Sequence, residues 1–163
     1  MLRIIKILED TMVDGPGFRT AIYCAGCHHH CPGCHNQQTW DEKAGSDMTT
    51  DEIMAVIKAD PFANVTFTGG DPLYQAEGFA ELAEAIKRET DKNIWCYTGF
   101  LYEQLLVEEQ PHRLLNSIDV LVDGPFIEEQ KDPDLLFRGS ANQRLIDVKR
   151  SLEAGEAIIW ERE

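Results

Sequence analysis

The sequence reads Gly-Cys-His-His-His-Cys-Pro-Gly-Cys-His-Asn from Gly26 to Asn36. Its cysteines, Cys27, Cys31 and Cys34, have the spacing C-x3-C-x2-C. Three thiolates on one short loop can bind three irons of a four-iron, four-sulfur cluster, because cysteine thiolates are the ligands of such clusters. The fourth iron would then lack a protein ligand. Catalytic metal sites keep such an open position, so this stretch predicts an enzyme.

The same segment can also be interpreted as a zinc site. Cys24 precedes Cys27 by three residues, so Cys24 pairs with Cys27 and Cys31 with Cys34 as two C-x2-C units. Paired units of this kind bind zinc, but a dozen or more residues normally separate them. Here only the three histidines at 28–30 separate the two units. A histidine-rich tract can itself bind zinc. The spacing favours an iron–sulfur cluster and leaves a zinc-binding interaction protein open.

Length and composition restrict the class of protein. The 163 residues are expected to form a single domain, residues 1–163, with a proper core. The net charge of −14 disfavours binding to nucleic acid through its phosphates. No apolar run approaches the ~18 to 20 residues that span a bilayer, and the basic, apolar N-terminus lacks a signal-peptide cleavage site. Five cysteines, four of them crowded together, do not form a disulfide framework, so the sequence predicts a cytoplasmic protein.

Strand and helix signals alternate along the chain. We expect strands over 3–8, 19–24, 64–68, 94–97, 118–122, 145–148 and 158–160, and helices over 49–60, 78–88 and 101–107. This alternation is typical of an α/β fold with a mainly parallel sheet. A closed eight-stranded barrel usually takes ~250 residues. The sequence therefore predicts a partial, incomplete TIM-like barrel.

Glycine-containing loops follow several of the expected strands. The cysteine loop follows the second strand, and the later loops are Gly69–Pro72, Thr98–Gly99 and Asp123–Pro125. The carboxyl ends of parallel strands meet at one edge of a sheet, so these loops should form a single site. Glycine lets a ligand approach the backbone closely, and Asp71 can accept a hydrogen bond from a ligand ammonium.

Several motifs together carry a family resemblance. The cysteine loop and the later Thr68-Gly69-Gly70-Asp71-Pro72-Leu73 resemble the paired signatures of radical S-adenosylmethionine enzymes. Val13-Asp14-Gly15-Pro16-Gly17-Phe18-Arg19 narrows the resemblance to the activases of glycyl-radical enzymes. Within these activases, the chain is similar to those that activate the anaerobic ribonucleoside-triphosphate reductase. The similarity lies in the segments 122–127 and 138–144 and in the small size of the chain. The resemblance extends from about Ile7 to Val148.

The resemblance implies the cofactors and their ligands. Cys27, Cys31 and Cys34 would hold one [4Fe-4S] cluster, the catalytic centre, and S-adenosylmethionine would coordinate its open iron. The turn Gly69-Gly70-Asp71, which we call the glycine turn, would bind the methionine end of S-adenosylmethionine. The residues around the last cysteine would flank the nucleoside. The expected contacts with S-adenosylmethionine are Gly33, Cys34, His35, Thr68, Gly69, Gly70, Asp71 and Asp123.

The resemblance also implies a reaction and partners. Reductive cleavage of S-adenosylmethionine would yield a 5′-deoxyadenosyl radical, which would generate a glycyl radical on the glycyl-radical subunit of the reductase. The electron would come from a reduced flavodoxin or a ferredoxin-type donor. The expected contacts with the reductase are the turn 14–17, the histidines 28–30 and the segment 138–144. A small enzyme of this superfamily acting on a free metabolite, such as a carboxy-deazaguanine synthase, remains an alternative and would need its own closed, polar pocket.

Overall fold

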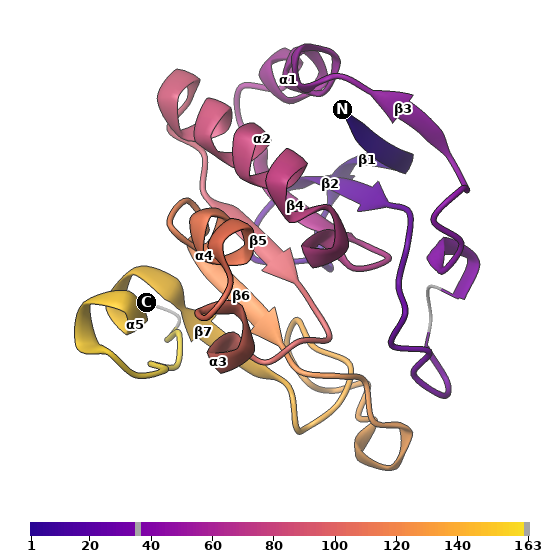
Figure 1. Cartoon of the computed structure of the whole chain (residues 1–163), viewed down its shortest axis with the longest axis vertical. Coiled ribbons are helices and arrows are strands. Elements are labelled where there is room, and N and C mark those ends of the chain that lie inside the picture. The colour runs from indigo at the N-terminus through magenta and orange to yellow at the C-terminus, as the bar shows by residue number, and fades with distance from the viewer. Residues whose placement is uncertain (35–36, 162–163) are drawn as a thin grey trace.

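The computed structural model describes residues 1–34 and 37–161. Within these residues, seven strands form one sheet in the order β3-β1-β2-β4-β5-β6-β7 (Figure 1). In chain order the strands are β1 (Leu2–Thr11), β2 (Arg19–Cys24), β3 (Ser46–Met48), β4 (Asn64–Gly69), β5 (Ile94–Tyr97), β6 (Val120–Asp123) and β7 (Arg144–Asp147). The α/β class is as predicted.

The sheet is parallel only in its centre. The pairs β2–β4, β4–β5 and β5–β6 are parallel, whereas β1–β2, β1–β3 and β6–β7 are antiparallel. A parallel pair needs a crossover, usually helical, that returns the chain to the starting edge. The loop between β6 and β7 contains only the short 3-10 helix η3 (Glu128–Gln130). The sheet is open, so the expected partial barrel is realised only as a mixed, unclosed sheet.

The helices are α1 (Thr50–Ala59), α2 (Ala76–Glu89), α3 (Tyr102–Leu105), α4 (Glu109–Leu115) and α5 (Val148–Ala154), with 3-10 turns η1 (Gln37–Thr39) and η2 (Pro72–Gln75). The predicted capping box of α1 is confirmed, since Thr49 accepts from the Glu52 amide at 3.1 Å and the Glu52 side chain accepts from the Thr49 amide at 3.2 Å. No helix in the described part of the chain is long and apolar enough to cross a membrane.

Some elements differ from the expectation. The short strand β3 and the helices α4 and α5 were not expected, and the predicted helix over 101–107 is reduced to α3. Pro111 is tolerated because it is the third residue of α4, where its missing amide hydrogen has no intrahelical acceptor. The predicted strand over 158–160 is wrong. Only a single bridge joins Ile159 to Ile146 of β7.

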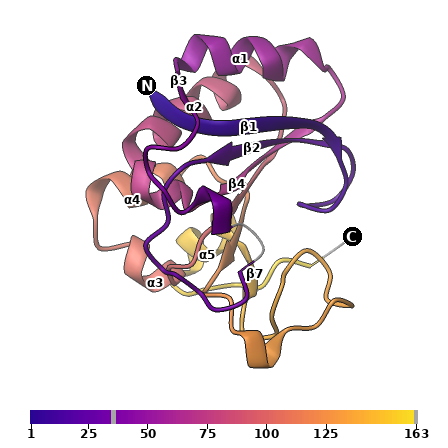
Figure 2. The same cartoon turned by 90° about the vertical axis from the view of Figure 1, so that its right-hand side faces the viewer.

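One face of the sheet is covered by helices. Figures 1 and 2 show α1, α2 and α4 along this face. The helix α2 buries the predicted side chains Phe79, Leu82, Ala83 and Ile86 completely, and the Phe79 ring lies 4.7 Å from that of Phe67 in β4. Each fully buried side chain of the Phe, Leu or Ile type stabilises the fold by about 1.5–3 kcal/mol relative to exposure. Cys24 and Cys96 belong to this core, as predicted for Cys24.

The opposite face is more polar. Successive side chains of a strand point to opposite faces, so Trp95 and Tyr97 lie here while Cys96 faces the helices. The Arg19 guanidinium is buried on this face, 5.6 Å from the Trp95 ring. It donates to the Thr66 hydroxyl and to the Val65 carbonyl, both at 2.8 Å. These acceptors satisfy N–H groups of the guanidinium, and burial lowers the pKa of Arg19 to about 10.

Candidate functional site

The more polar face of the sheet, opposite the face covered by α1, α2 and α4, opens into a cavity of about 720 Å³. The volume lies within the range of small-molecule sites. The cavity lies at the carboxyl ends of β2, β4 and β5, the edge at which ligands bind in open α/β sheets. It is lined by the three motif cysteines, by the turn at 69–71 and by Tyr97 at the end of β5. The hairpin formed by β1, β2 and the loop between them contributes Val13, Asp14 and Tyr23, and the loop between β6 and β7 contributes Phe126, Leu136, Phe137 and Arg138.

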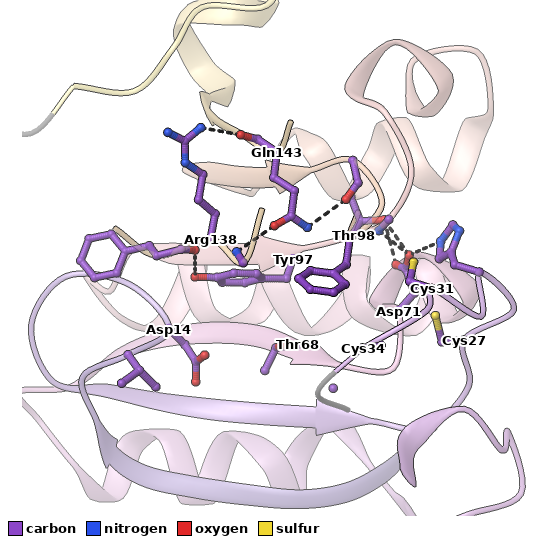
Figure 3. A pocket seen from close by; sticks show the side chains of 18 of the residues that line it. Asp14, Cys27, Cys31, Cys34, Thr68, Asp71, Tyr97, Thr98, Arg138 and Gln143 are labelled. Atoms are coloured by element: carbon purple, nitrogen blue, oxygen red, sulfur yellow. Dashed lines mark hydrogen bonds and ion pairs between the residues drawn. The ribbon is translucent and has the colours of Figure 1, made fainter. Parts of the chain in front are cut away.

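Most of the sequence-predicted site residues meet in this cavity. Its lining includes Cys27, Cys31, Cys34, Thr68, Gly69, Gly70 and Asp71. Figure 3 shows the cysteines and Asp71 on one side of the cavity, with Asp14 and Arg138 away from them. Gly33 and Asp123 do not line the cavity. His35 lies outside the described residues.

The two glycines of the turn serve the protein backbone. A Cβ atom on Gly70 would lie 2.4 Å from the Gly26 carbonyl oxygen, and one on Gly69 would lie 2.5 Å from the Cys24 amide nitrogen. The Gly70 amide also donates to the Cys24 carbonyl at 2.8 Å. Both glycines also line the cavity, so the expectation that they make room for a ligand stays a prediction. They first allow the turn to pack on the residues that begin the cysteine loop.

Asp71 is the centre of a hydrogen-bond network. Its buried carboxylate accepts from the Thr98 hydroxyl at 2.8 and 2.9 Å, from the Gly99 amide at 2.9 Å and from the Leu73 amide at 3.0 Å. His29 Nε2 donates to Oδ2 at 2.7 Å. A ligand ammonium at Asp71 would therefore have to share or replace one of these donors. Dashed lines in Figure 3 mark the hydrogen bonds of Asp71 with other residues that line the cavity.

The motif cysteines are half-buried thiols. Burial raises the pKa of Cys27 to about 11, and the nearby Asp71 and the other two cysteines act in the same direction. Burial likewise raises the pKa of Cys31. The thiolate forms are favoured by backbone hydrogen bonds, from His29 to Cys27 and from Phe126 to Cys31.

This donor set fits a cationic cluster. Thiolates in such surroundings are stabilised when metal cations bind them, because a coordinating thiol is deprotonated outright. Cys27, Cys31 and Cys34 would hold three irons of a [4Fe-4S] cluster facing the cavity. No three Cys, His, Asp or Glu side chains among residues 1–34 and 37–161 are grouped as ligands of a single metal ion.

The turn 14–17 is fixed on the sheet. Arg19 donates to the Pro16 carbonyl at 3.0 Å, and the Thr66 hydroxyl donates to the Asp14 carbonyl at 2.7 Å. Tyr23 donates its hydroxyl to the Asp14 carboxylate at 3.3 Å, and burial raises the pKa of Asp14. The Arg in the Gly-Pro-Gly-Phe-Arg motif therefore holds the turn in place, and the Asp14 side chain lines the cavity.

The segment 138–144 uses its two arginines differently. Arg144 Nε donates to the buried Asp123 at 3.0 Å, and its terminal nitrogen donates to Glu103 at 2.7 Å. Asp123 also accepts from the Tyr102 amide at 2.8 Å. Arg138, in contrast, lines the cavity and donates to the Gln143 carbonyl at 2.6 Å. Asp123 thus lies in an internal ion pair and Arg138 lies at the cavity.

Sequence reasoning missed several aromatic and apolar lining residues. The Tyr97 hydroxyl donates to the Phe137 carbonyl at 2.7 Å and so ties the loop before β7 to the sheet. The cavity is also lined by Phe126, Leu135 and Leu136. A detectable signal was the run Leu135-Leu136-Phe137, which is apolar although it lies in a loop.

The sequence is similar to known proteins over most of its length. A family model described as a 4Fe-4S single cluster domain matches residues 13–146. An anaerobic ribonucleoside-triphosphate reductase-activating protein of Vibrio cholerae is 42% identical over 140 residues, covering 81% of this chain and 89% of the relative. The protein of the same name from Haemophilus influenzae is 39% identical over 150 residues, covering 87% of this chain and 96% of the relative.

The chain belongs to the family of anaerobic ribonucleoside-triphosphate reductase-activating proteins. An Escherichia coli protein of this name is 35% identical over 140 residues, covering 81% of this chain and 90% of the relative. The matched family region contains the cysteine loop, the glycine turn and β7 up to Ile146. Membership in this family confirms the predicted activase class and favours a [4Fe-4S] cluster over zinc.

Proposed function

We propose that this protein activates the anaerobic ribonucleoside-triphosphate reductase by generating a glycyl radical on it. A reduced [4Fe-4S] cluster would supply one electron to S-adenosylmethionine, whose cleavage to methionine yields a 5′-deoxyadenosyl radical that takes a hydrogen atom from a glycine of the reductase. The observation that supports this most is the convergence of Cys27, Cys31 and Cys34 with the glycine turn in one cavity.

The residues of the chain would hold and orient the reactants. Cys27, Cys31 and Cys34 would bind the cluster. The turn 68–71 lies beside them and would receive the methionine end of S-adenosylmethionine, with Gly33, Cys34 and His35 near the nucleoside. Asp123 is better suited to holding β6 and β7 together than to contacting the cofactor, because Arg144 neutralises it away from the cavity.

A carbon radical survives only where water and stray hydrogen donors are kept away. The aromatic side chains Tyr97, Phe126 and Phe137 would exclude water from the inner cavity. The outer cavity carries exposed apolar side chains, Met12 and Val13 of the hairpin and Leu136 of the loop before β7. We propose that the glycine-bearing segment of the reductase covers these three side chains, which we call the apolar mouth.

The cysteines are tested by anaerobic reconstitution. The protein should bind about four irons per chain and give the spectra of a [4Fe-4S] cluster. Cys27→Ala, Cys31→Ala or Cys34→Ala should lose both the iron and S-adenosylmethionine cleavage. Cys24→Ala and Cys96→Ala are matched controls, because both residues are buried in the helix-covered core. One stoichiometric zinc without iron uptake would contradict the proposal, and equal iron loss in Cys24→Ala would contradict the choice of ligands.

The apolar mouth is tested by mixing the protein with reductase, reductant and S-adenosylmethionine. A glycyl-radical doublet should appear on the reductase chain. Leu136→Asp should lower the rate of its formation about tenfold or more, because a buried interface anchor becomes charged. Cleavage of S-adenosylmethionine without the reductase should change less. Phe62→Asp is the control, since Phe62 is exposed near the opposite end of β4. Equal effects of both variants would place the contact elsewhere.

The remaining assignments are parts of the same proposal. A reduced flavodoxin or ferredoxin-type protein would deliver the electron, the chain would act as one domain over 1–163, and it would work in the reducing cytoplasm. All five cysteines are free thiols, which suits such a compartment. A free-metabolite substrate is less favoured, because the relatives are named as activators of the reductase.

A further inference from the structure

The three consecutive histidines of the cysteine loop have different surroundings. His28 lies 3.7 Å from Glu42, and 56% of its side chain is accessible although its ring lies 4.6 Å from that of Tyr74. The His30 ring packs edge-on against Trp40 at 4.6 Å. The His29 side chain is only 17% exposed and points back to the sheet. The middle histidine therefore lies inside the site, although sequence reasoning treated all three alike.

The acceptor of His29 is fixed in place. Asp71 is held by Thr98 and Gly99, which follow β5, and by the amide of Leu73 in η2. His29 Nε2 lies 2.7 Å from Asp71 Oδ2. This contact joins the cysteine loop to the turns that follow β4 and β5.

The His29 ring is also closely packed. It lies edge-on to Phe100, with 4.6 Å between ring centroids, and at 5.6 Å from Tyr74. A Cβ atom on Gly99 would lie 2.6 Å from the His29 ring, so the ring rests on bare backbone. Such a position fixes both the rotamer of His29 and the path of the loop on either side of it.

We infer that His29 is a positioning residue that anchors the loop between Cys27 and Cys31 to Asp71 and thereby fixes two cluster ligands. The inference rests on the proposed function, because it assigns the cluster to these cysteines. His29 lies midway between them, two residues from each. Its Nε2 is bonded to Asp71, so His29 orients the cysteine ligands through the loop without being a ligand itself.

The anchor has an electronic consequence. The backbone amide of His29 hydrogen-bonds to the Cys27 sulfur. Hydrogen bonds to the sulfurs help to set the reduction potential of an iron–sulfur cluster, because they stabilise the more negative, reduced form. If the side chain no longer holds residue 29, this hydrogen bond weakens. The potential of the cluster should then become more negative.

The first measurement uses the full-length, metal-free protein and so does not depend on cluster chemistry. We expect amide hydrogen exchange in residues 27–31 to be about tenfold faster in His29→Ala than in the unmodified protein, since a buried hydrogen bond to a carboxylate is lost. His28→Ala is the matched control and should leave the exchange unchanged. Gly99→Ala keeps the histidine at position 29 but should push its ring out of place, because the added Cβ would lie 2.6 Å from the ring. We expect it to act like His29→Ala.

The second measurement uses the reconstituted protein. His29→Ala should bind iron but show a more negative potential and faster cluster loss in air, and His29→Gln should restore both, because its amide can donate to Asp71. Equal exchange rates and potentials in His29→Ala and His28→Ala would overturn the inference, as would failure of His29→Gln to restore them. If the unmodified protein takes up no iron, the proposed function fails instead.

Discussion

Gly70→Ala is expected to abolish iron binding in the reconstituted protein. The added Cβ would lie 2.4 Å from the Gly26 carbonyl oxygen and 2.8 Å from its carbon, distances that backbone atoms cannot accommodate without moving. The Asp71 amide donates to the same Gly26 carbonyl at 2.7 Å, so this bond would break. Because Gly26 begins the cysteine loop, the displacement is transmitted to Cys27. Overpacking typically costs about 1–3 kcal/mol, and a clash with backbone atoms belongs at the upper end of this range.

Iron per chain and thermal unfolding together measure this effect. Gly155→Ala is the control, because Gly155 ends α5 with nothing within 4 Å of the added atom. Its positive φ of 75° gives alanine a strain of about 1–2 kcal/mol, without any clash near the site. We expect Gly155→Ala to keep its iron. Normal iron content with weakened S-adenosylmethionine binding in Gly70→Ala would instead show that the glycine serves the ligand directly.

The two roles of Gly70 show where sequence reasoning reaches its limit. A glycine that admits a ligand and a glycine that admits another backbone segment both lack a side chain for the same steric reason, so the motif alone cannot separate them. The backbone that Gly70 meets, at Gly26, lies 44 positions earlier in the chain. The location of the site could be predicted, but the contact that makes the glycine necessary could not.

The central strands were predictable because their signals are local. Runs such as 64–68 and 94–97 are short and rich in β-branched or aromatic residues, and each is followed by a turn that contains glycine. The ends of the sheet were less predictable, since the direction of β7 depends on whether the loop before it crosses the sheet. The helix α4 follows α3 after only a short connection, so the two could not be separated by periodicity.

The partners of the charged site residues were also hidden from the sequence. Asp71 carries a motif signal, yet its donors Thr98 and Gly99 are 27 and 28 residues away. Asp123 and Arg144 are separated by 21 residues. Tertiary pairing of this kind is set by the sheet order and has no local signature. The sequence therefore identified the charged residues but not which of them neutralise one another.

The pair of Asp123 and Arg144 gives the second large effect. Arg144→Ala should destabilise the protein by about 3–5 kcal/mol, because it leaves a fully buried carboxylate without its cation. The Arg144 side chain is 32% exposed, so water can partly replace it and the lower end of this range applies. The melting temperature should fall by roughly 6–12 °C. The loss of reductase activation would then follow from unfolding rather than from a lost partner contact.

A second substitution separates charge burial from other causes. Adding Asp123→Asn to Arg144→Ala should recover much of the stability, because the amide is neutral and its oxygen can still accept from the Tyr102 amide. If the double variant melts no higher than Arg144→Ala, the buried charge is not the source of the loss. Arg138→Ala is the contrasting variant, since Arg138 bonds one carbonyl of its own loop and lines the cavity. It should melt within a few degrees of the unmodified protein while slowing radical transfer to the reductase, whereas unchanged transfer would remove Arg138 from the proposed contact surface.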